Sequence, residues 1–355
     1  MKQNLLSYSK KEIATHFTVN DIEKEFRATQ VFSWLYDRGI TSFDMMHNIP
    51  IALREYLVKN FEIVIPKCHK ESISSDGTIK WLLSTEENDL RFHIETVYIP
   101  ERERGTLCVS SQVGCPIKCT FCHTGTQKFA KNLTTGEIIG QLLFAYQRLE
   151  TLRIKQTFTS NISNIVFMGM GEPLLNYNNV VKAITIIISA KIFNITSKRI
   201  TVSTSGIVPK IKALGNDVKV KLAISLHAVK DEIRNHLVPL NKKYPISILL
   251  EACREYYQTT REKITFEYIM LEGVNDSDDD AYAMIKVVQN VSCKINLIPF
   301  NKWDGSNYNS STSERIQRFQ QILKNAGYIT TIRKNRGQDI MAACGQLKSN
   351  CNTSC

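Results

Sequence analysis

The feature that most constrains the fold is a regular alternation of apolar and amphipathic segments after about residue 106. Six apolar stretches of strand length are each followed by a stretch with helical periodicity. Strands are expected at 106–110, 163–168, 199–203, 220–226, 264–270 and 293–298, and helices at 134–149, 178–190, 207–214, 247–258, 278–290 and 313–326. Serial strand–helix units predict a parallel sheet covered by helices. Eight units close a full barrel, so six predict an α/β fold with a partial barrel, which segment 328–333 would extend.

A small helical module is expected before this pattern, in residues 1–75. Ser9 and Glu12 match the S-x-x-E capping box that opens a helix. A second helix is expected between Asp21 and Arg38, and a third from near Pro50. The apolar residues of the second helix recur at helical spacing and are expected in a core: Phe26, Val31, Trp34 and Leu35. Such a module can also bind RNA, although its charge does not require it.

A β-hairpin is predicted between the helical module and the alternating region. Residues 80–83 and 90–99 alternate in strand fashion around the turn-forming residues 86–89. We therefore expect a hairpin and linker at 76–100, the core at 101–335, and a C-terminal loop with a polar tail at 336–355.

Charge is distributed unevenly along the chain. Residues 1–100 carry 12 Lys and Arg against 14 Asp and Glu, whereas the remaining residues carry 33 against 20. The positive excess thus falls in the core, where it would attract a polyanionic substrate such as RNA. A basic chain alone does not establish nucleic-acid binding.

Hydropathy and cysteine content indicate the compartment. There is no run of eighteen apolar residues, and the first residues lack an apolar signal core. A cytoplasmic protein with no membrane partner is therefore expected. Ten cysteines in a cytoplasmic chain favour free thiols, metal ligands or catalysis over a disulfide framework.

The sequence CPIKCTFC contains three cysteines in eight residues: Cys115, Cys119 and Cys122. A short loop can bring three thiolates to one side of an iron–sulfur cube, which leaves the fourth iron open to a small molecule. Chance clustering and a structural zinc site are the alternatives. A zinc site needs a fourth ligand, which here would require His123 to turn inward.

Polar residues follow several of the predicted strands, at the edge where parallel barrels bind ligands. The sequence GMGEP at 169–173 follows the second strand, Ser203 ends the third, and Asn301 follows the sixth. Ser225, Leu226 and His227 end the fourth. Glycines allow close approach of the backbone, and Glu172 offers an acceptor to an ammonium or a ribose hydroxyl. Each feature has a structural explanation by itself, but together they predict a bound cofactor.

These motifs resemble those of radical S-adenosylmethionine (SAM) enzymes, and in particular the RlmN family. The matching segments are TLCVSSQVGCPIKCTFC at 106–122, FMGMGEP at 167–173, STSG at 203–206, SLH at 225–227 and AACGQL at 342–347. The resemblance implies a partial barrel of the radical SAM type with a 4Fe–4S cluster on Cys115, Cys119 and Cys122. It also implies SAM contacts from a further set of residues: Gly171, Glu172, Ser203, Ser225, Leu226, His227 and Asn301.

The resemblance implies methylation of carbon 2 of adenosine in 23S ribosomal RNA and transfer RNA. One SAM would methylate Cys344, and a second would yield the radical that activates this methyl group. Glu95 would accept the carbon-2 proton, and Cys108 would release the protein–RNA adduct by forming a disulfide with Cys344. A flavodoxin or ferredoxin system would supply the electron, and a monomer is expected.

Three other functions remain open from the sequence: a Cfr-like methylation of carbon 8, a radical enzyme without an RNA substrate, and an RNA-binding protein with a structural metal. Candidate phosphate contacts are Arg333, Lys334 and Arg336, beside Cys344 in a glycine-bounded loop for which mobility is expected. We assign Cys68, Cys253 and Cys293 to packing and Cys351 and Cys355 to the polar tail.

Overall fold

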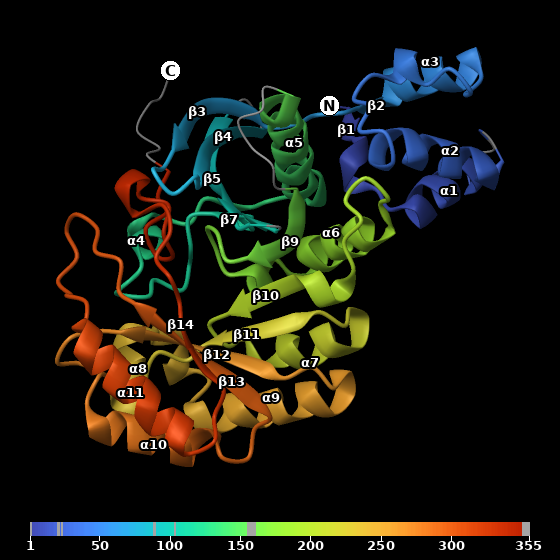
Figure 1. Ribbon diagram of the computed structural model, residues 1–355. Helices are drawn as coiled ribbons and strands as arrows, with labels where there is room; N and C mark the ends of the chain where they lie inside the picture. Colours follow the sequence, from blue (N-terminus) through green and yellow to red (C-terminus); the bar gives the residue numbers. More distant parts are fainter. Residues whose placement is uncertain are drawn as a thin grey trace.

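The computed structural model describes residues 2–19, 22, 24–87, 90–102, 104–154 and 161–349 of the 355-residue chain. Several predicted features fall outside these residues: the helix start at Asp21, the second half of the hairpin turn at 88–89, and Cys351 and Cys355 in the tail. One ten-stranded sheet, with helices packed against it, forms the body of the molecule (Figure 1).

Seven strands of this sheet run parallel, in the order β14-β13-β12-β11-β10-β9-β6. Their bounds are β6 Gly105–Cys108, β9 Ile162–Phe167, β10 Ile200–Thr204, β11 Lys221–Ser225, β12 Ile264–Met270, β13 Cys293–Pro299 and β14 Thr330–Ile332. The helices that follow them are α5 Thr135–Ile154, α6 Tyr177–Ser189, α7 Val208–Asp217, α9 Ile246–Thr260, α10 Asp278–Val288 and α11 Ser313–Asn325. All six predicted units and the predicted edge strand are therefore confirmed.

Shorter elements were not predicted, because they are too short to show a period. The helices are α4 His123–Thr126 and α8 Asp231–Leu237, and β7 Gln112–Val113 pairs with β8 Lys131–Asn132. Single 3₁₀ turns cover Leu5–Ser7, Phe43–Met45, Pro173–Asn176, Ser197–Arg199, Pro239–Lys242 and Gln338–Ile340.

Three antiparallel strands continue the sheet beyond β6: β5 Leu90–Pro100, β4 Ile79–Glu87 and β3 Lys67–Ile73. The predicted hairpin is confirmed as β4 and β5. Strand β3 lies in the range expected to be helical, and it escaped notice because it is a largely exposed edge strand with few apolar residues. The hairpin is thus continuous with the parallel sheet.

The amino-terminal helices α1 Lys10–Val19, α2 Glu25–Tyr36 and α3 Ile51–Asn60 form a separate lobe beside α6, and β1 Gln3–Asn4 pairs with β2 Phe61–Glu62 (Figure 1). The Ser9–Glu12 capping box is confirmed, with Ser9 N donating to Glu12 Oε2 over 2.8 Å. The expectation that Phe26 is in the core is wrong. Its side chain lies on the outer face of α2, 51% exposed, with the Arg27 guanidinium over its ring.

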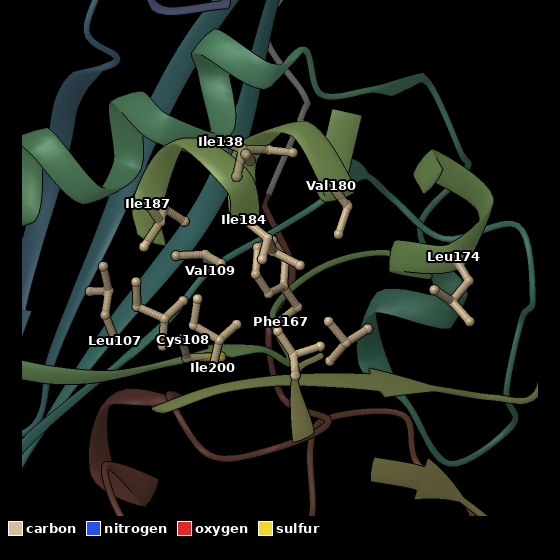
Figure 2. Packing of buried hydrophobic residues seen from close by; sticks show 14 of the residues in the cluster. Leu107, Cys108, Val109, Ile138, Phe167, Leu174, Val180, Ile184, Ile187 and Ile200 are labelled. Carbon is tan, nitrogen blue, oxygen red and sulfur yellow. The ribbon is translucent and has the colours of Figure 1, made fainter. Parts of the chain in front are cut away.

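The core lies between the sheet and its helices. In Figure 2, Leu107 and Phe167 of the sheet pack with Ile184 and Ile187 of α6 and Ile138 of α5. Full burial of each such side chain contributes about 1.5–3 kcal/mol relative to exposure. No helix among the described residues is both long and apolar enough to span a membrane.

A buried amide links α5 to the sheet where β5 and β6 separate. Gln141 Oε1 accepts from Thr96 Oγ1 at 2.8 Å and from Ser110 N at 2.9 Å, and its Nε2 donates to Ser110 O at 3.0 Å. Ser110 Oγ in turn donates to Glu95 O at 2.6 Å. This network fixes the backbone just before the cysteine loop.

Replacing Gln141 with leucine should lower the free energy of unfolding by about 3 kcal/mol or more, because three buried polar groups lose their partner. Gln147→Leu on the exposed face of the same helix removes only the exposed hydrogen bond from Nε2 to Gly39 O at 3.2 Å, and it should change the free energy of unfolding by no more than about 1 kcal/mol. Urea unfolding of both variants tests this. Equal losses would assign the effect to the helix rather than to the amide network.

Candidate active site

One pocket opens at the carboxyl ends of β6 and β9 to β12. Most of the residues predicted for the cluster and for SAM line it: Cys115, Cys119, Cys122, Gly171, Glu172, Ser203, Ser225 and His227. They come from the carboxyl ends of β10 and β11 and from the loops that follow β6, β9 and β11, which meet because parallel strands end at the same edge. We call this the cofactor pocket.

The cysteine loop presents its three thiols to this pocket. Lys118 adopts a left-handed conformation, Cys122 N donates to Cys119 O at 3.1 Å, and α4 then begins after Cys122. Only glycine fits at position 125, since an added Cβ would lie 2.7 Å from Cys119 O. The tight loop therefore holds three sulfurs at one wall.

The donor set fits an iron–sulfur cube. Burial raises the pKa of the Cys115 thiol to about 12 and also raises those of Cys119 and Cys122, with the neighbouring thiols adding to each. Iron binding would supply the positive charge that such thiolates need. No three His, Cys, Asp or Glu side chains of the described residues are close enough to hold a single metal ion. A cube instead spreads three thiolates over three irons.

His123, the possible fourth zinc ligand, does not join the three thiols. Its ring stacks on Trp303, with 4.5 Å between centroids, and its Nδ1 lies 3.2 Å from Gln346 O. Its backbone N donates to Gly345 O at 2.7 Å. His123 therefore connects the cysteine loop to the C-terminal segment.

Glu172 joins two loops of the pocket. Its carboxylate accepts from Leu174 N at 3.1 Å and from Ser205 N at 2.8 Å. Burial raises the pKa of this carboxyl, and the amide donors oppose that shift. Gly171 precedes it with φ +99°, a conformation that favours glycine. The carboxylate is thus fixed at the pocket wall with lone pairs left for a ligand.

The imidazole ring of His227 is neutral, and a backbone hydrogen bond fixes its orientation. Its Nδ1 accepts from Ile269 N at 3.1 Å, which places the ring proton on Nε2. Burial lowers its pKa to about 3, and the Arg234 charge contributes. The adjacent Leu226 is different, because its side chain is buried in the core and does not line the pocket.

A second pocket adjoins the first, and we call it the basic pocket. Cys108, Asn301, Arg333, Lys334, Arg336 and Cys344 are among the residues that line it. Cys344 lines both pockets. Asn301 thus lies apart from the other predicted SAM contacts, since its amide donates to Cys344 O at 3.3 Å and accepts from Gln338 Nε2 at 2.9 Å.

Cys108 and Glu95 are both buried. Figure 2 shows Cys108 of β6 among packed apolar side chains near Leu107 and Ile200. The Glu95 carboxylate lies 2.8 Å from Lys80 Nζ and accepts from Lys348 N at 2.9 Å. Burial raises the pKa of Glu95, whereas Lys80 opposes that shift. Glu95 lines neither pocket and instead holds the C-terminal segment.

Two buried charged residues at the site were not predicted from the sequence. Glu267 of β12 lines the cofactor pocket and accepts from Ser203 Oγ at 2.9 Å. Arg234 of α8 donates to Leu226 O, Ser225 O and Ser205 O at 2.8–3.0 Å, which fixes the loops after β10 and β11. A single carboxylate in the apolar segment ITFEYIM was a usable signal for Glu267.

The cysteines assigned to packing behave differently from one another. Cys253 is buried as expected, and Cys293 is partly buried. The assignment of Cys68 to packing is wrong, because it is exposed on the edge strand β3.

The fold and the cofactor pocket together define a radical SAM enzyme. The family model of the radical SAM superfamily matches residues 109–285. A solved radical SAM methyltransferase from Sphaerobacter thermophilus is 40% identical, with a TM-score of 0.88 and coverage of 98% of this chain and 99% of that chain.

The amino-terminal lobe indicates a particular family within the radical SAM enzymes. Residues 3–63 match the family model of the ribosomal RNA large subunit methyltransferase N-terminal domain. The dual-specificity RNA methyltransferase RlmN of Bradyrhizobium sp. is 49% identical over 98% of this chain and 89% of its own length. The dual-specificity RNA methyltransferase RlmN of Methylocella silvestris is 50% identical over 92% of this chain and 85% of its own length. The chain belongs to the RlmN family of radical SAM RNA methyltransferases.

Cys122→Ala should abolish binding of the iron–sulfur cluster, since two thiolates remain at the loop. Iron and sulfide analysis and the visible absorption of anaerobically reconstituted protein measure this. Cys68→Ala is the matched control, because it removes an exposed thiol outside both pockets and should keep the full cluster content. Full cluster content in Cys122→Ala would remove this residue from the ligand set.

His227 should make the protein sensitive to acid. Its folded pKa of about 3 lies below the ordinary value of 6.5, so between these values the unfolded chain binds a proton that the folded one does not. The free energy of unfolding therefore falls as pH decreases below 6.5, by up to about 1.4 kcal/mol per pH unit from this group.

His227→Gln should flatten the dependence of urea unfolding on pH between about 7 and 5, where this histidine contributes to the slope. The exposed His47→Gln variant should keep the slope of the wild type. An unchanged slope in His227→Gln would mean that His227 binds its proton equally well in the folded and unfolded states.

Proposed function

We propose that the protein methylates carbon 2 of adenosine in 23S ribosomal RNA and transfer RNA, using two SAM molecules per turnover. The observation that carries the proposal is the position of Cys344, which lines both the cofactor pocket and the basic pocket. A methyl carrier must meet SAM on one side and RNA on the other.

The chemistry of the target calls for such a carrier. Carbon 2 of adenine is electron-poor and has no acidic proton. It therefore cannot attack the methyl group of SAM as a nucleophile, whereas a carbon radical can add to it. When bound, a 4Fe–4S cluster supplies the electron that splits SAM into methionine and a 5′-deoxyadenosyl radical. The Cys344 thiolate would first attack the methyl group of one SAM and displace S-adenosylhomocysteine. The 5′-deoxyadenosyl radical from the second SAM would then remove a hydrogen atom from this methyl group, and the resulting methylene carbon would add to the base.

Two further residues would complete the cycle. Glu95 would accept the carbon-2 proton, and the segment that holds it through Lys348 N would have to shift to expose it. Cys108 shares the basic pocket with Cys344 and would attack the Cys344 sulfur, releasing methylated RNA and leaving a disulfide. A cytoplasmic reductant would then restore both thiols, and a flavodoxin or ferredoxin system would supply the electron for the cluster.

Mass spectrometry of RNA nucleosides after reaction with reconstituted enzyme and SAM tests the proposal. We expect 2-methyladenosine from the wild type and none from Cys344→Ala, since the methyl carrier is lost. Cys108→Ala should accumulate the protein–RNA adduct. Cys253→Ala, a buried thiol outside both pockets, should retain product formation.

Product methylated at carbon 8 would instead assign a Cfr-like function. Cleavage of SAM without RNA methylation, unchanged in Cys344→Ala, would assign a radical enzyme with another substrate.

A further inference from the structure

We propose that Lys80 is a positioning residue for Cys344, because its ion pair with Glu95 joins the two ends of the loop that carries this cysteine. We call residues 342–347 the Cys344 loop. The role of Lys80 rests on the proposed function, in which Cys344 must meet SAM and RNA in turn. The contacts themselves are measured without either ligand.

The Lys80–Glu95 pair connects the ends of the Cys344 loop through three contacts in a row. Lys80 Nζ donates to Met341 O at 3.1 Å and lies 2.8 Å from Glu95 Oε1. Glu95 Oε2 accepts from Lys348 N at 2.9 Å. The ammonium therefore binds the residue before the loop, and the carboxylate binds the residue after it. With both ends fixed, the loop between them has few conformations.

The Lys80–Glu95 pair is buried between the sheet and the C-terminal segment. The side chains of Lys80 and Glu95 are 15% and 7% exposed. They project from the face of β4 and β5 opposite to α5, since the adjacent Trp81 and Thr96 contact α5 from the other face. Removing one partner of a buried ion pair leaves an uncompensated charge, so each partner should matter.

The backbone of Met341 shows why this end of the loop needs a contact. Met341 has a left-handed conformation with φ +53°, which is unfavourable for a residue with a Cβ. Such strain persists where surrounding contacts hold it. The bond from Lys80 to Met341 O is one such contact, and Ala342 N donates to Gly337 O at 2.8 Å beside it. Lys80 thus fixes the direction in which the loop starts.

A second anchor holds the other half of the Cys344 loop. On α4, His123 N donates to Gly345 O at 2.7 Å, and Thr124 Oγ1 donates to Leu347 O. Cys344 lies between this anchor and the one at Met341. Both anchors are therefore required to place its sulfur at the junction of the two pockets.

Lys80 can act on Cys344 only through the backbone of the loop. Lys80 lines neither pocket, whereas Cys344 lines both, and Ala342 and Ala343 line the basic pocket. Replacing Lys80 should therefore displace Cys344 without changing the groups that would bind SAM.

Hydrogen exchange of the C-terminal segment tests the role of Lys80. The anaerobic, cluster-loaded enzyme without SAM or RNA is exchanged, and peptic peptides from 337–349 are compared with peptides from β12. Lys80→Met should accelerate exchange in 337–349 at least about tenfold, because bonds to a charged group are lost, and should leave β12 unchanged. Lys80→Arg should restore much of the protection, since a guanidinium can also donate to two acceptors.

Lys70→Met is the matched control for the loss of a positive charge. Lys70 is an exposed lysine of β3 whose charge also acts on Glu95. Its replacement keeps the three contacts and should not change the exchange. Wild-type exchange in Lys80→Met would overturn the proposal, as would an equal acceleration in β12, which would assign Lys80 to the stability of the whole sheet.

Glu95→Gln tests the same contacts from the other partner. A single amide oxygen cannot replace two carboxylate oxygens, so this variant should also accelerate exchange in 337–349. The double variant Lys80→Met/Glu95→Gln should exchange no faster than the faster single variant, because the two side chains act as one unit. Additive effects would mean that Lys80 and Glu95 act separately, which contradicts the proposal.

The rate of Cys344 methylation separates positioning from a general loss of structure. The same protein is incubated with SAM alone, and the methyl group is quantified on the tryptic peptide 337–348, in which Cys344 is the single cysteine. Lys80→Met should lower the maximal rate about tenfold to a hundredfold, because the sulfur is misplaced. The SAM concentration that gives half the maximal rate should not change. A rise in that concentration with an unchanged maximal rate would contradict a positioning role.

These measurements are separable from the test of the proposed function. Exchange can follow the predicted pattern in an enzyme whose wild type forms neither methylated Cys344 nor 2-methyladenosine, which would contradict the proposed function and leave the Lys80–Glu95 pair as the contact that holds the loop. Conversely, Lys80→Met can form 2-methyladenosine at the rate of the wild type, which would contradict only the role of Lys80.

Discussion

The site depends on one constraint: the segment after β14 must lie across the edge of the sheet, so that Cys344 reaches both pockets. The antiparallel extension holds it there. Ser75 N donates to Asp339 Oδ2 at 3.0 Å, Lys80 Nζ to Met341 O at 3.1 Å, and Lys348 N to Glu95 Oε2 at 2.9 Å. In Figure 1 this red segment runs from β14 past α4 toward β3. Strands β3 to β5 and the turn between β3 and β4 therefore hold the C-terminal segment in place.

A second constraint is electrostatic. The site contains five thiols in or beside a poorly hydrated space, and burial raises the pKa of each. Buried charge is costly unless it is paired or bonded. Neighbouring groups offset this cost. A backbone amide donates to Glu172, Lys80 forms an ion pair with Glu95, and Arg333 forms one with Glu267. The three thiols of the cysteine loop would need the positive charge of bound iron to become thiolates.

Much of this arrangement could be predicted from the sequence. The six strand–helix units were visible because each buries a face with its own period, and the cysteine loop because its ligands are close in the chain. Strand β3 and the exposed Phe26 were misjudged. An edge strand has no buried face to impose alternation, and a helical period does not tell which apolar residue is left outside. Glu267 was missed because its partners, Ser203 and Arg333, are more than sixty residues away.

The sequence by itself determined the class of fold, the cysteine loop and the set of polar strand ends, because these depend on local period and short spacing. Only the tertiary structure decided how they divide between two pockets. Asn301 and Glu95 bind the C-terminal segment instead of lining the cofactor pocket, and Arg333 turns inward while Lys334 stays exposed. The physical reason is that contacts between β12, the β3–β5 extension and the chain end join residues far apart in sequence, and no local pattern encodes which of them meet.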